Sequence, residues 1–439
     1  MIDKRLYIAI NEAPEQLENW QNFAAAFRML DVVRFDPALK KAIIDCLEQP
    51  IRNPQDLARV GTSLVKLTPG FELRFGPHVL DPLLLALLNK ILITDPQLEQ
   101  VLTGARRHLL THGWKPDYLH FLEALVVQCR RNEFVYFASP EEENLARKAP
   151  PLIQEAYFSL ENVSHGTVET RTSIKNAVSQ KVAAQYEENP YPQWDLLPLP
   201  NRSIYPSEIA SAKEILIAGC GTGQHAFQAA EIFPNAQIDA FDLSYTSLSY
   251  ALSKKREERL SFFQADLLEL DNWEKRFDLI ECSGVLHHME DPIRGWSILR
   301  KLLKPDGWML LGLYSAIGRK DIAAARHLIQ NRDLRTARQI LLELADDHPA
   351  KAVTHTIDFY TQSGCRDLLF HAHEVTFNLE EIETILPTLN LRFDHFIQRD
   401  EKLASLKLTL KEWAEYEKAN PTTFSGMYQF WVRPAVPSD

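Results

Sequence analysis

The chain has 439 residues, of which 45% are hydrophobic, and a formal net charge of −11. This length exceeds that of one ordinary domain, so we expect two. The acidic balance argues against passive adhesion to nucleic acid or to an anionic membrane, because both interactions require basic surface. No apolar run approaches the ~20 residues that a membrane-spanning helix needs.

The N-terminus and the cysteines indicate the compartment. Residues Met1–Leu6 lack the pattern of a signal peptide, so we expect a cytoplasmic protein. The five cysteines are scattered and form no C-x-x-C pair. They are typical of reduced, buried thiols rather than of a disulfide framework or a zinc site, and we expect no metal.

Residues 1–165 show helical periodicity and almost no strand signal, which predicts an all-helical N-terminal domain. Several candidate helices begin with proline in the first turn, a favourable opening position. The segment Asp81–Leu88 is apolar nearly all round, so its helix should be central and buried. The candidate helices are Gln16–Leu30, Pro37–Leu47, Pro54–Leu67, Pro82–Leu92, Pro96–His112, Pro116–Arg131 and Glu141–Ala149.

Residues 166–206 form a connector or lid. Its proline-rich part, Asn189–Pro206, can be neither continuous helix nor central strand, because proline removes donors and breaks both. Two interpretations remain open. The segment is either a rigid connector between domains, or its aromatic side chains Tyr186, Tyr191 and Trp194 fold over the ligand site that follows and help to build it.

A glycine-rich turn is the most informative feature of the chain. Ile215–Ala218 is a short apolar run typical of a buried strand, and a helical pattern begins at Gln224. Strand, glycine turn and helix build the nucleotide-binding crevice of an open parallel sheet. Glycine is needed there for close backbone approach and for positive φ. The three glycines of this turn are Gly219, Gly221 and Gly223.

The second strand of this unit, Gln237–Phe241, ends in Asp242. This acid lies 242 − 219 = 23 residues past the first glycine. The spacing is close to the roughly 20 expected for a carboxylate that binds ribose hydroxyls. The sequence therefore predicts a nucleotide-type ligand at this edge of the sheet.

Three further strands follow in order, and with them a family resemblance. The strands are Leu260–Asp266, Phe277–His288 and Met309–Tyr314, the last after a turn at Lys304–Gly307. With these segments the chain resembles the class I S-adenosylmethionine-dependent methyltransferases over roughly residues 180–435. A nicotinamide dehydrogenase would more often show G-x-G-x-x-G, with the third glycine one position later.

This resemblance implies an α/β fold with a doubly wound, seven-stranded sheet of order 3-2-1-4-5-7-6, whose last strand is antiparallel. The methyltransferase domain would span 207–439, with a helical insertion at 318–387. Strands six and seven would be Leu391–Ile397 and Met427–Val432. The remaining candidate helices are Ile322–Gln330, Leu334–Ala345, Ala350–Ser363, Leu379–Leu386 and Leu403–Ala419.

A closer resemblance, to a bacterial group of methyltransferases often fused to helical repeats of the tetratricopeptide type, lies on four segments. It brings no settled substrate with it, and residues 1–165 themselves show no clean period of ~34 residues. The segments are Asp95–Thr103, Gln128–Tyr136, Gln185–Trp194 and Ser363–Phe370.

The cofactor implied by the resemblance is S-adenosylmethionine. The glycine turn would approach its methionine moiety and ribose, while Asp242 would bind the ribose hydroxyls and Asp266 the adenine. The end of strand four would present the methyl group to the acceptor. The residues expected to bind the cofactor are Gly219, Cys220, Gly221, Gly223, Asp242, Leu243, Asp266, Leu267, Ser283 and Gly284, with Cys220 serving for packing rather than as a nucleophile.

The catalytic residues are not assigned by the sequence. His287 of the pair His287-His288, Tyr314 and Tyr191 are candidates, although in this family such histidines often hold the loop after strand four. Arg366, Asp367, His371 and His373 either pack near the acceptor pocket or form an internal network of ion pairs that orders the insertion.

The sequence thus predicts a methyltransferase that acts on a protein side chain or a small molecule. The helical domain would orient the acceptor or pair two copies of the chain. The alternative is a non-catalytic, adenosylmethionine-binding scaffold. RNA is a weaker acceptor candidate, because the composition shows no basic groove and the N-P-P-Y type of motif is absent after strand four.

Overall fold

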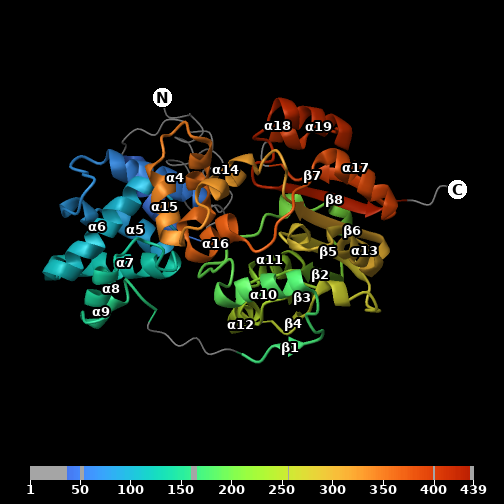
Figure 1. Ribbon diagram of the computed structural model, residues 1–439, viewed down its shortest axis with the longest axis horizontal. Helices are drawn as coiled ribbons and strands as arrows, with labels where there is room; N and C mark the ends of the chain where they lie inside the picture. The colour runs from blue at the N-terminus through green and yellow to red at the C-terminus, as the bar shows by residue number, and fades with distance from the viewer. Residues whose placement is uncertain (1–36, 50–53, 160–165, 256, 399–400, 436–439) are drawn as a thin grey trace. The chain divides into compact units, whose positions relative to one another are not determined.

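The computed structural model describes residues 37–49, 54–159, 166–255, 257–398 and 401–435 (Figure 1). The candidate helix Gln16–Leu30 lies outside these residues. The chain divides into two compact units. The helical unit comprises the described parts of 1–163 together with 194–199 and 331–365, and the sheet unit comprises 164–193, 200–330 and 366–439.

Proline does open most helices of the helical unit. Aspartate or serine side chains cap several of them: Asp81 caps α5, Asp95 caps α6 and Ser139 caps α8. Residues 116–118 form a 3-10 turn, so α7 begins three residues later than predicted. The helices are α3 (Pro37–Leu47), α4 (Pro54–Leu67), α5 (Pro82–Lys90), α6 (Pro96–His112), α7 (Leu119–Arg131), α8 (Pro140–Ala146), α9 (Pro151–Gln154) and α15 (Leu334–Glu343).

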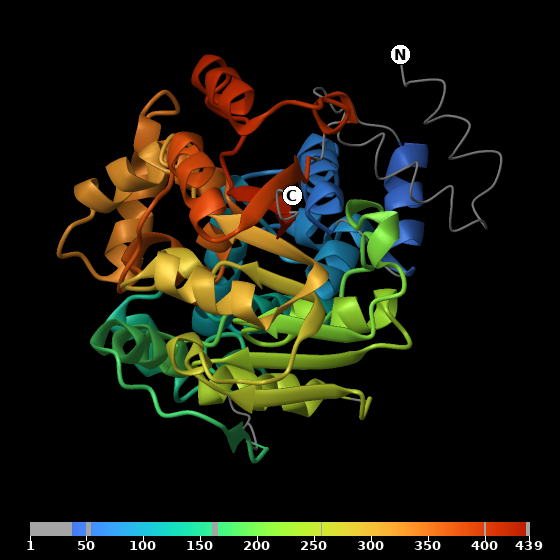
Figure 2. The same cartoon turned by 90° about the vertical axis from the view of Figure 1, so that its right-hand side faces the viewer.

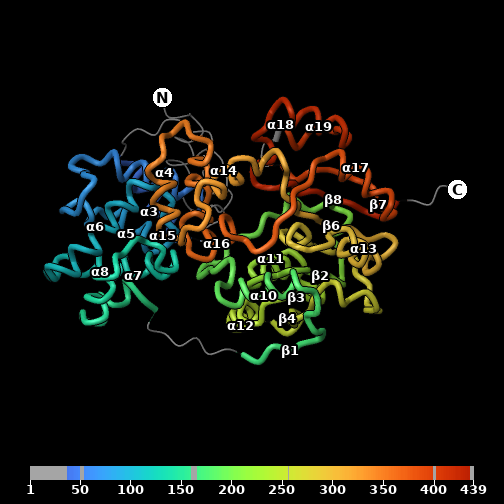
Figure 3. The backbone as a smooth tube through the Cα atoms, in the orientation of Figure 1, coloured from blue at the N-terminus to red at the C-terminus, as the bar shows by residue number. Residues whose placement is uncertain are grey.

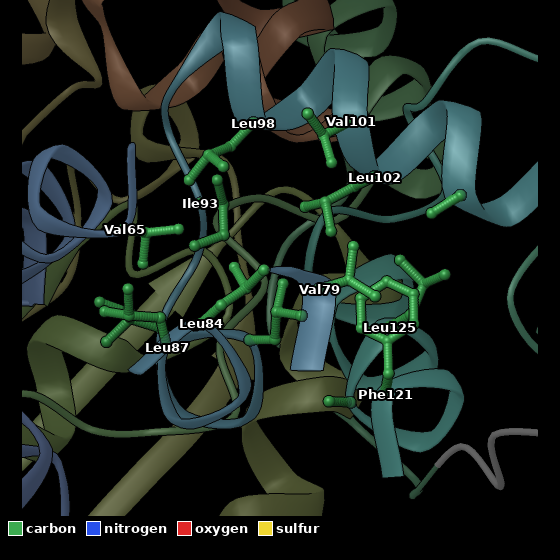
Figure 4. Packing of buried hydrophobic residues seen from close by; sticks show 14 of the residues in the cluster. Val65, Val79, Leu84, Leu87, Ile93, Leu98, Val101, Leu102, Phe121 and Leu125 are labelled. Carbon is green, nitrogen blue, oxygen red and sulfur yellow. The ribbon is translucent and has the colours of Figure 1, made fainter. Parts of the chain in front are cut away.

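Helix α5 is central to the core of this unit, as its composition predicted. Leu83, Leu84, Leu87 and Leu88 are fully buried, and Figure 4 shows Leu84 and Leu87 among side chains of the neighbouring helices. A Cβ on Gly61 of α4 would lie 2.8 Å from Leu87 Cδ2, so glycine permits this close helix packing.

Residues 331–365 belong to the helical unit, although they lie within the predicted insertion. The reason is packing on α15. Ala337 and Leu341 are buried, and the buried Arg338 donates to both carboxylate oxygens of Glu99 at 2.8 Å. A fragment starting after the helical N-terminal part would leave this buried cation without its partner.

The sheet unit contains an eight-stranded sheet of order β1-β4-β3-β2-β5-β6-β8-β7. The predicted number of seven strands is wrong, because the two-residue strand β1 pairs with β4 and adds an eighth strand at the edge of the sheet. Without β1, the remaining order corresponds to 3-2-1-4-5-7-6. The strands are β1 (Glu169–Thr170), β2 (Glu214–Ala218), β3 (Gln237–Asp242), β4 (Leu260–Gln264), β5 (Phe277–Ser283), β6 (Leu303–Leu313), β7 (Leu391–Phe396) and β8 (Tyr428–Pro434).

Both faces of this sheet are covered (Figure 2). Leu216 and Ala218 of β2 join one buried cluster, which includes Trp296. Ile215 and Ile217 join the other, on the opposite face. Burial on both faces explains why β2 is an uninterrupted apolar run rather than an alternating one. The helices of the unit are α10 (Ala177–Glu188), α11 (Gln224–Ile232), α12 (Tyr245–Lys254), α13 (Pro292–Leu302), α14 (Lys320–Leu328), α17 (Leu379–Thr388), α18 (Glu401–Ala404) and α19 (Leu410–Ala419).

Three segments differ from the prediction. Residues 304–307, expected as a turn before a strand, are a bulge within β6: Phe277 pairs with Leu303, and Leu279 pairs with Trp308. The predicted helix over 350–363 is instead two 3-10 turns followed by α16 (Gln362–Phe370). The helix predicted over 403–419 is broken into α18 and α19, because Thr409 caps α19 in a capping box with Glu412.

No helix in the described ranges has the length and apolarity that crossing a membrane requires.

A pH-dependent contact lies inside the helical unit. The carboxylate of Glu133 accepts hydrogen bonds from the backbone N–H of Ser363 at 2.6 Å and from its hydroxyl at 2.7 Å. Burial raises the pKa of Glu133 to about 7, and the two hydrogen bonds oppose this effect only in part. A carboxyl group whose pKa is higher in the folded state loses stability as the pH rises.

We therefore expect Glu133→Gln to stabilise the chain at pH 8 and to have little effect near pH 5. A pKa difference of one corresponds to about 1.4 kcal/mol, so the gain should be of the order of one to a few kcal/mol. Urea denaturation from pH 5 to pH 8 measures it. An effect that is independent of pH would contradict this assignment.

Candidate functional site

A cavity of about 300 Å³ lies in the sheet unit and is lined by the segments that follow β2, β3, β4, β5 and β6. β2 is the strand at which the order of the sheet reverses, since it lies between β3 and β5. Ligands of open α/β sheets bind outside the carboxyl ends of the strands at such a reversal. The path from β2 through α11 to β3 can be followed in Figure 3.

The glycine turn after β2 has positive φ at Gly219, Gly221 and Gly223, with values of 68°, 51° and 85°. A Cβ on Gly221 would lie 2.6 Å from the carbonyl oxygen of Tyr191, so only glycine fits. Gly219 and Gly221 line the cavity, but Gly223 does not. Gly223 instead permits close packing of α11, because its Cβ would lie 2.8 Å from Ala251 Cβ.

Asp242 joins the end of β3 to the glycine turn. Its Oδ2 accepts from the backbone N–H of Gly221 at 2.8 Å, and its Oδ1 accepts from that of Ser244 at 2.9 Å. Burial raises the pKa of Asp242, and these amides partly offset the effect. A carboxylate has about four acceptor positions, so it can still accept from a ligand in the cavity.

Asp266 follows β4 and is buried. Its Oδ1 accepts from the backbone N–H of Leu268 at 3.0 Å. Its Oδ2 is buried without a short hydrogen bond in the described part of the chain, while the Ser179 side chain, which also lines the cavity, lowers the pKa that burial raises. Since Asp266 also lines the cavity, this oxygen offers an acceptor to a ligand donor.

The other predicted residues also line the cavity: Cys220, Leu243, Leu267, Ser283 and Gly284. A Cβ on Gly284, which has a φ of 76°, would meet no atom within 4 Å and would project into open space. Burial raises the pKa of the Cys220 thiol well above its usual value, which agrees with a packing role.

The aromatic segment, residues 186–194, is held against the glycine turn. Tyr186, Tyr191 and Pro192 line the cavity. The Thr222 hydroxyl donates to the Pro192 carbonyl, and the Ser244 hydroxyl donates to that of Tyr186 at 3.1 Å. These contacts favour the interpretation that this part helps to build the cavity, whereas Trp194 belongs to the helical unit and does not line the cavity.

Of the catalytic candidates, Tyr191 and Tyr314 line the cavity, but His287 does not. His287 is fully buried and stacks on Tyr314, with ring centroids 3.7 Å apart. Its neighbour His288 lines the cavity instead. The short 3-10 turn over Leu286–His288 directs the two side chains differently, which sequence adjacency alone does not reveal.

Several lining residues were not predicted to bind a ligand. His225, in the first turn of α11, forms an ion pair with the buried Glu281 of β5, which raises the pKa of His225 despite burial. No sequence motif marks these lining residues, so only their positions in the folded chain identify them. The unpredicted lining residues include Ser179, Val182, Gln224, His225, Met289 and Met427.

A polar cluster from three segments borders the cavity. The Tyr186 hydroxyl donates to Asp367 Oδ1 at 2.6 Å and lies 3.2 Å from His371 Nε2. The rings of His371 and His288 are stacked, with centroids 3.5 Å apart. Burial raises the pKa of Asp367 and lowers those of both histidines.

His288, Asp367 and His371 offer ligand atoms within 4.8 Å of one another, so the group must be considered as a metal site. The stacked rings are nearly parallel, with an interplanar angle of 19°. Nitrogen lone pairs lie in the ring planes, so those of stacked rings do not converge on one ion at the ~2.0 Å that a metal–imidazole bond requires. This arrangement does not favour a metal, and its absence stays a prediction.

The segment 366–374 was predicted either to pack near the acceptor pocket or to form an internal network of ion pairs, and the structure shows features of both. Asp367 lines the cavity. Glu374 instead holds an ion-pair network, accepting from Arg319 Nε at 3.0 Å and from Arg326 at 2.8 Å. The Arg319 guanidinium lies 3.7 Å above the Tyr314 ring, so this network also fixes a side chain of the cavity.

Comparison with known proteins identifies part of the chain. Residues 216–309 match the model of a methyltransferase domain. An uncharacterized protein of Synechococcus sp. is 29% identical over 259 residues, which cover 52% of this chain and 62% of the relative. A malonyl-[acyl-carrier protein] O-methyltransferase of Halalkalibacterium halodurans is 31% identical over 106 residues, covering 23% and 39%. Among solved structures, PKMT2 from Rickettsia typhi has 18% identity and a TM-score of 0.45, over 56% of this chain and 55% of that one. The chain thus spans less than two thirds of these curated relatives.

The residues of the cavity fit an S-adenosyl cofactor. The unpartnered Asp266 Oδ2 suits the exocyclic amine of adenine, and Asp242 suits paired hydroxyl groups. Among the described residues no lysine or arginine lines the cavity, so no cationic side chain there would repel the sulfonium of this ligand. The chain therefore contains a methyltransferase domain of the class I type, whose cofactor is S-adenosylmethionine.

Proposed function

We propose that the chain transfers a methyl group from S-adenosylmethionine to a protein side chain or a small molecule. The observation that carries the proposal is that one cavity is lined both by the residues suited to the cofactor and by a second polar group. This second group consists of Tyr186, Tyr191, Tyr314, His288 and Asp367. A cofactor-binding scaffold would have no need of it.

In this proposal the cofactor supplies a methyl group on a positively charged sulfur, which leaves as a neutral thioether. The protein therefore has two tasks, to position the acceptor in line and to keep water out. Pro192 and Tyr191, held on the glycine turn, would cover the cofactor. Tyr314, fixed by Arg319, would form the wall on the acceptor side.

The acceptor class is supported by composition and by the relatives only in outline. The net charge of −11 disfavours a nucleic acid. The name of one relative specifies malonyl-[acyl-carrier protein], but the shared segment covers 39% of that protein. We place a protein side chain slightly ahead of a small molecule, because a helical unit suits an extended partner. The boundaries of the catalytic and helical parts are proposed as the two units above.

Cofactor affinity should depend on Asp242. Hydrogen bonds to charged groups contribute roughly 1.5–3 kcal/mol each. Asp242→Ala should therefore weaken adenosylhomocysteine binding by at least about tenfold, measured by calorimetry. Asp271→Ala, at an exposed aspartate outside the cavity, is the matched control and should bind normally. Unchanged affinity in a folded Asp242→Ala variant would refute the ribose assignment.

Methyl transfer itself is tested with S-adenosylmethionine that carries a labelled methyl group. The chain is added to lysate from a strain that lacks it, and the products are fractionated. We expect label in protein or in small molecules, and none without added chain. Label confined to RNA would overturn the proposed acceptor class. Adenosylhomocysteine binding without any transfer would favour the scaffold alternative.

A further inference from the structure

We propose that His288 accepts the proton of the methyl acceptor, so that the acceptor is an N–H or O–H compound rather than a carboxylate. This inference rests on the proposed function and specifies the chemistry of the same cavity. Four observations carry it: the tautomer of His288, its position, the group that supports its ring, and the charges that line the cavity.

The tautomer of His288 is set by the backbone. Its Nδ1 lies 2.9 Å from the carbonyl oxygen of His373. A carbonyl oxygen can only accept, so Nδ1 carries the hydrogen of the neutral ring. The other nitrogen, Nε2, is then the acceptor. His288 is thus prepared to take a proton, and it lines the cavity together with Gly284 and Tyr314.

His371 supports the His288 ring from one face, in the stack described above. Its own tautomer is also set, because its Nδ1 accepts from the backbone N–H of His373 at 3.1 Å. Its Nε2 therefore carries hydrogen and faces the Tyr186 hydroxyl and Asp367 Oδ1, at 3.2 Å and 3.9 Å. In this arrangement His371 is a positioning residue that offers no free acceptor nitrogen for the proton that His288 takes, and Asp367 holds the Tyr186 hydroxyl at 2.6 Å.

The surroundings of His288 determine its pKa and therefore the pH range in which its ring is neutral and can accept a proton. Burial is the main cause that holds the pKa of His288 well below its usual value, and His287, His371 and Arg319 lower it further. The ring is therefore neutral at pH 7 and able to accept. A carboxylate oxygen of Asp367 lies within 4.8 Å of a ring nitrogen of His288. This carboxylate would stabilise the imidazolium once it has formed. Tyr314 lies against the ring edge, at 5.7 Å between centroids.

The cavity wall disfavours a carboxylate acceptor. Its acceptor end includes the carboxyl group of Asp367, and among the described residues no lysine or arginine that could pair with a substrate anion lines the cavity. A carboxylate would also need no proton acceptor, since it is already deprotonated near neutral pH. A neutral amine, hydroxyl or phenol fits both facts.

The step then balances. The lone pair of the acceptor nitrogen or oxygen forms the new bond to the methyl carbon, and the carbon–sulfur bond breaks with both electrons remaining on sulfur. The proton of the acceptor moves to His288 Nε2, and solvent later removes it. No oxidant, reductant or metal is required.

The test compares the full chain with His288→Ala and with His327→Ala, an exposed histidine of α14, in the labelled lysate assay. Because a general base contributes roughly 10²–10⁴-fold, we expect His288→Ala to lower methyl incorporation at least tenfold. Adenosylhomocysteine affinity should change by no more than about twofold in either variant. Added imidazole should restore part of the lost activity of His288→Ala, and His327→Ala should match the unchanged chain.

Treatment of the labelled product with alkali distinguishes the acceptor classes. We expect the label to stay bound, because methylamines and methyl ethers resist alkali. Release of labelled methanol would show a methyl ester and overturn the inference while leaving the proposed function intact. Full activity in His288→Ala would also overturn it. If the unchanged chain transfers no label at all, the proposed function fails, and the inference fails with it.

A second measurement separates positioning from simple structural support. Asp367→Asn keeps a hydrogen-bond acceptor for Tyr186 but removes the negative charge beside His288. Loss of that charge disfavours the imidazolium, so the acid limb of the pH–rate profile should shift to lower pH. An unchanged limb in an active variant would exclude this role for Asp367.

Discussion

The contact of the aromatic segment with the glycine turn is the constraint on which the rest of the site depends. Gly221 has room only for hydrogen, because the Tyr191 carbonyl oxygen occupies the position next to its Cα. The backbone N–H of Gly221 also donates to the carboxylate of Asp242. One glycine therefore links the end of β2, the end of β3 and the segment that precedes the sheet. Its conformation, with positive φ, is what makes all three meet at one point.

From this junction the cavity extends in two directions. Towards β4 it reaches Asp266, whose free oxygen suits an adenine amine. Towards β5 and β6 it reaches Gly284, Tyr314 and His288, where the polar cluster supplies a proton acceptor with a defined tautomer. The two ends differ in chemistry, one built from carboxylates that bind and the other from aromatic and imidazole groups that could react. This difference supports a transferase rather than a storage or scaffold role.

The sequence predicted the order of the main strands and many of the residues that line the cavity, because both depend on short local patterns. Apolar runs mark β2 to β6, Asp242 is the last residue of β3, and Asp266 lies two residues after the end of β4. The errors arise where distant segments meet. The sequence could not show that Arg338 pairs with Glu99, which assigns 331–365 to the helical unit. Nor could it show that His288 rather than His287 lines the cavity, or that Gly223 serves helix packing.

The central claim is that this cavity binds the S-adenosyl cofactor through Asp266 at its adenine end, and calorimetry with two ligands tests it most directly. The unchanged chain should bind adenosylhomocysteine with one site per chain. It should bind the inosine analogue, in which an oxygen replaces the exocyclic amine, at least about tenfold more weakly, because the buried Asp266 oxygen would lose its donor. Equal affinity for both ligands, or no binding of adenosylhomocysteine, would contradict this account of the site.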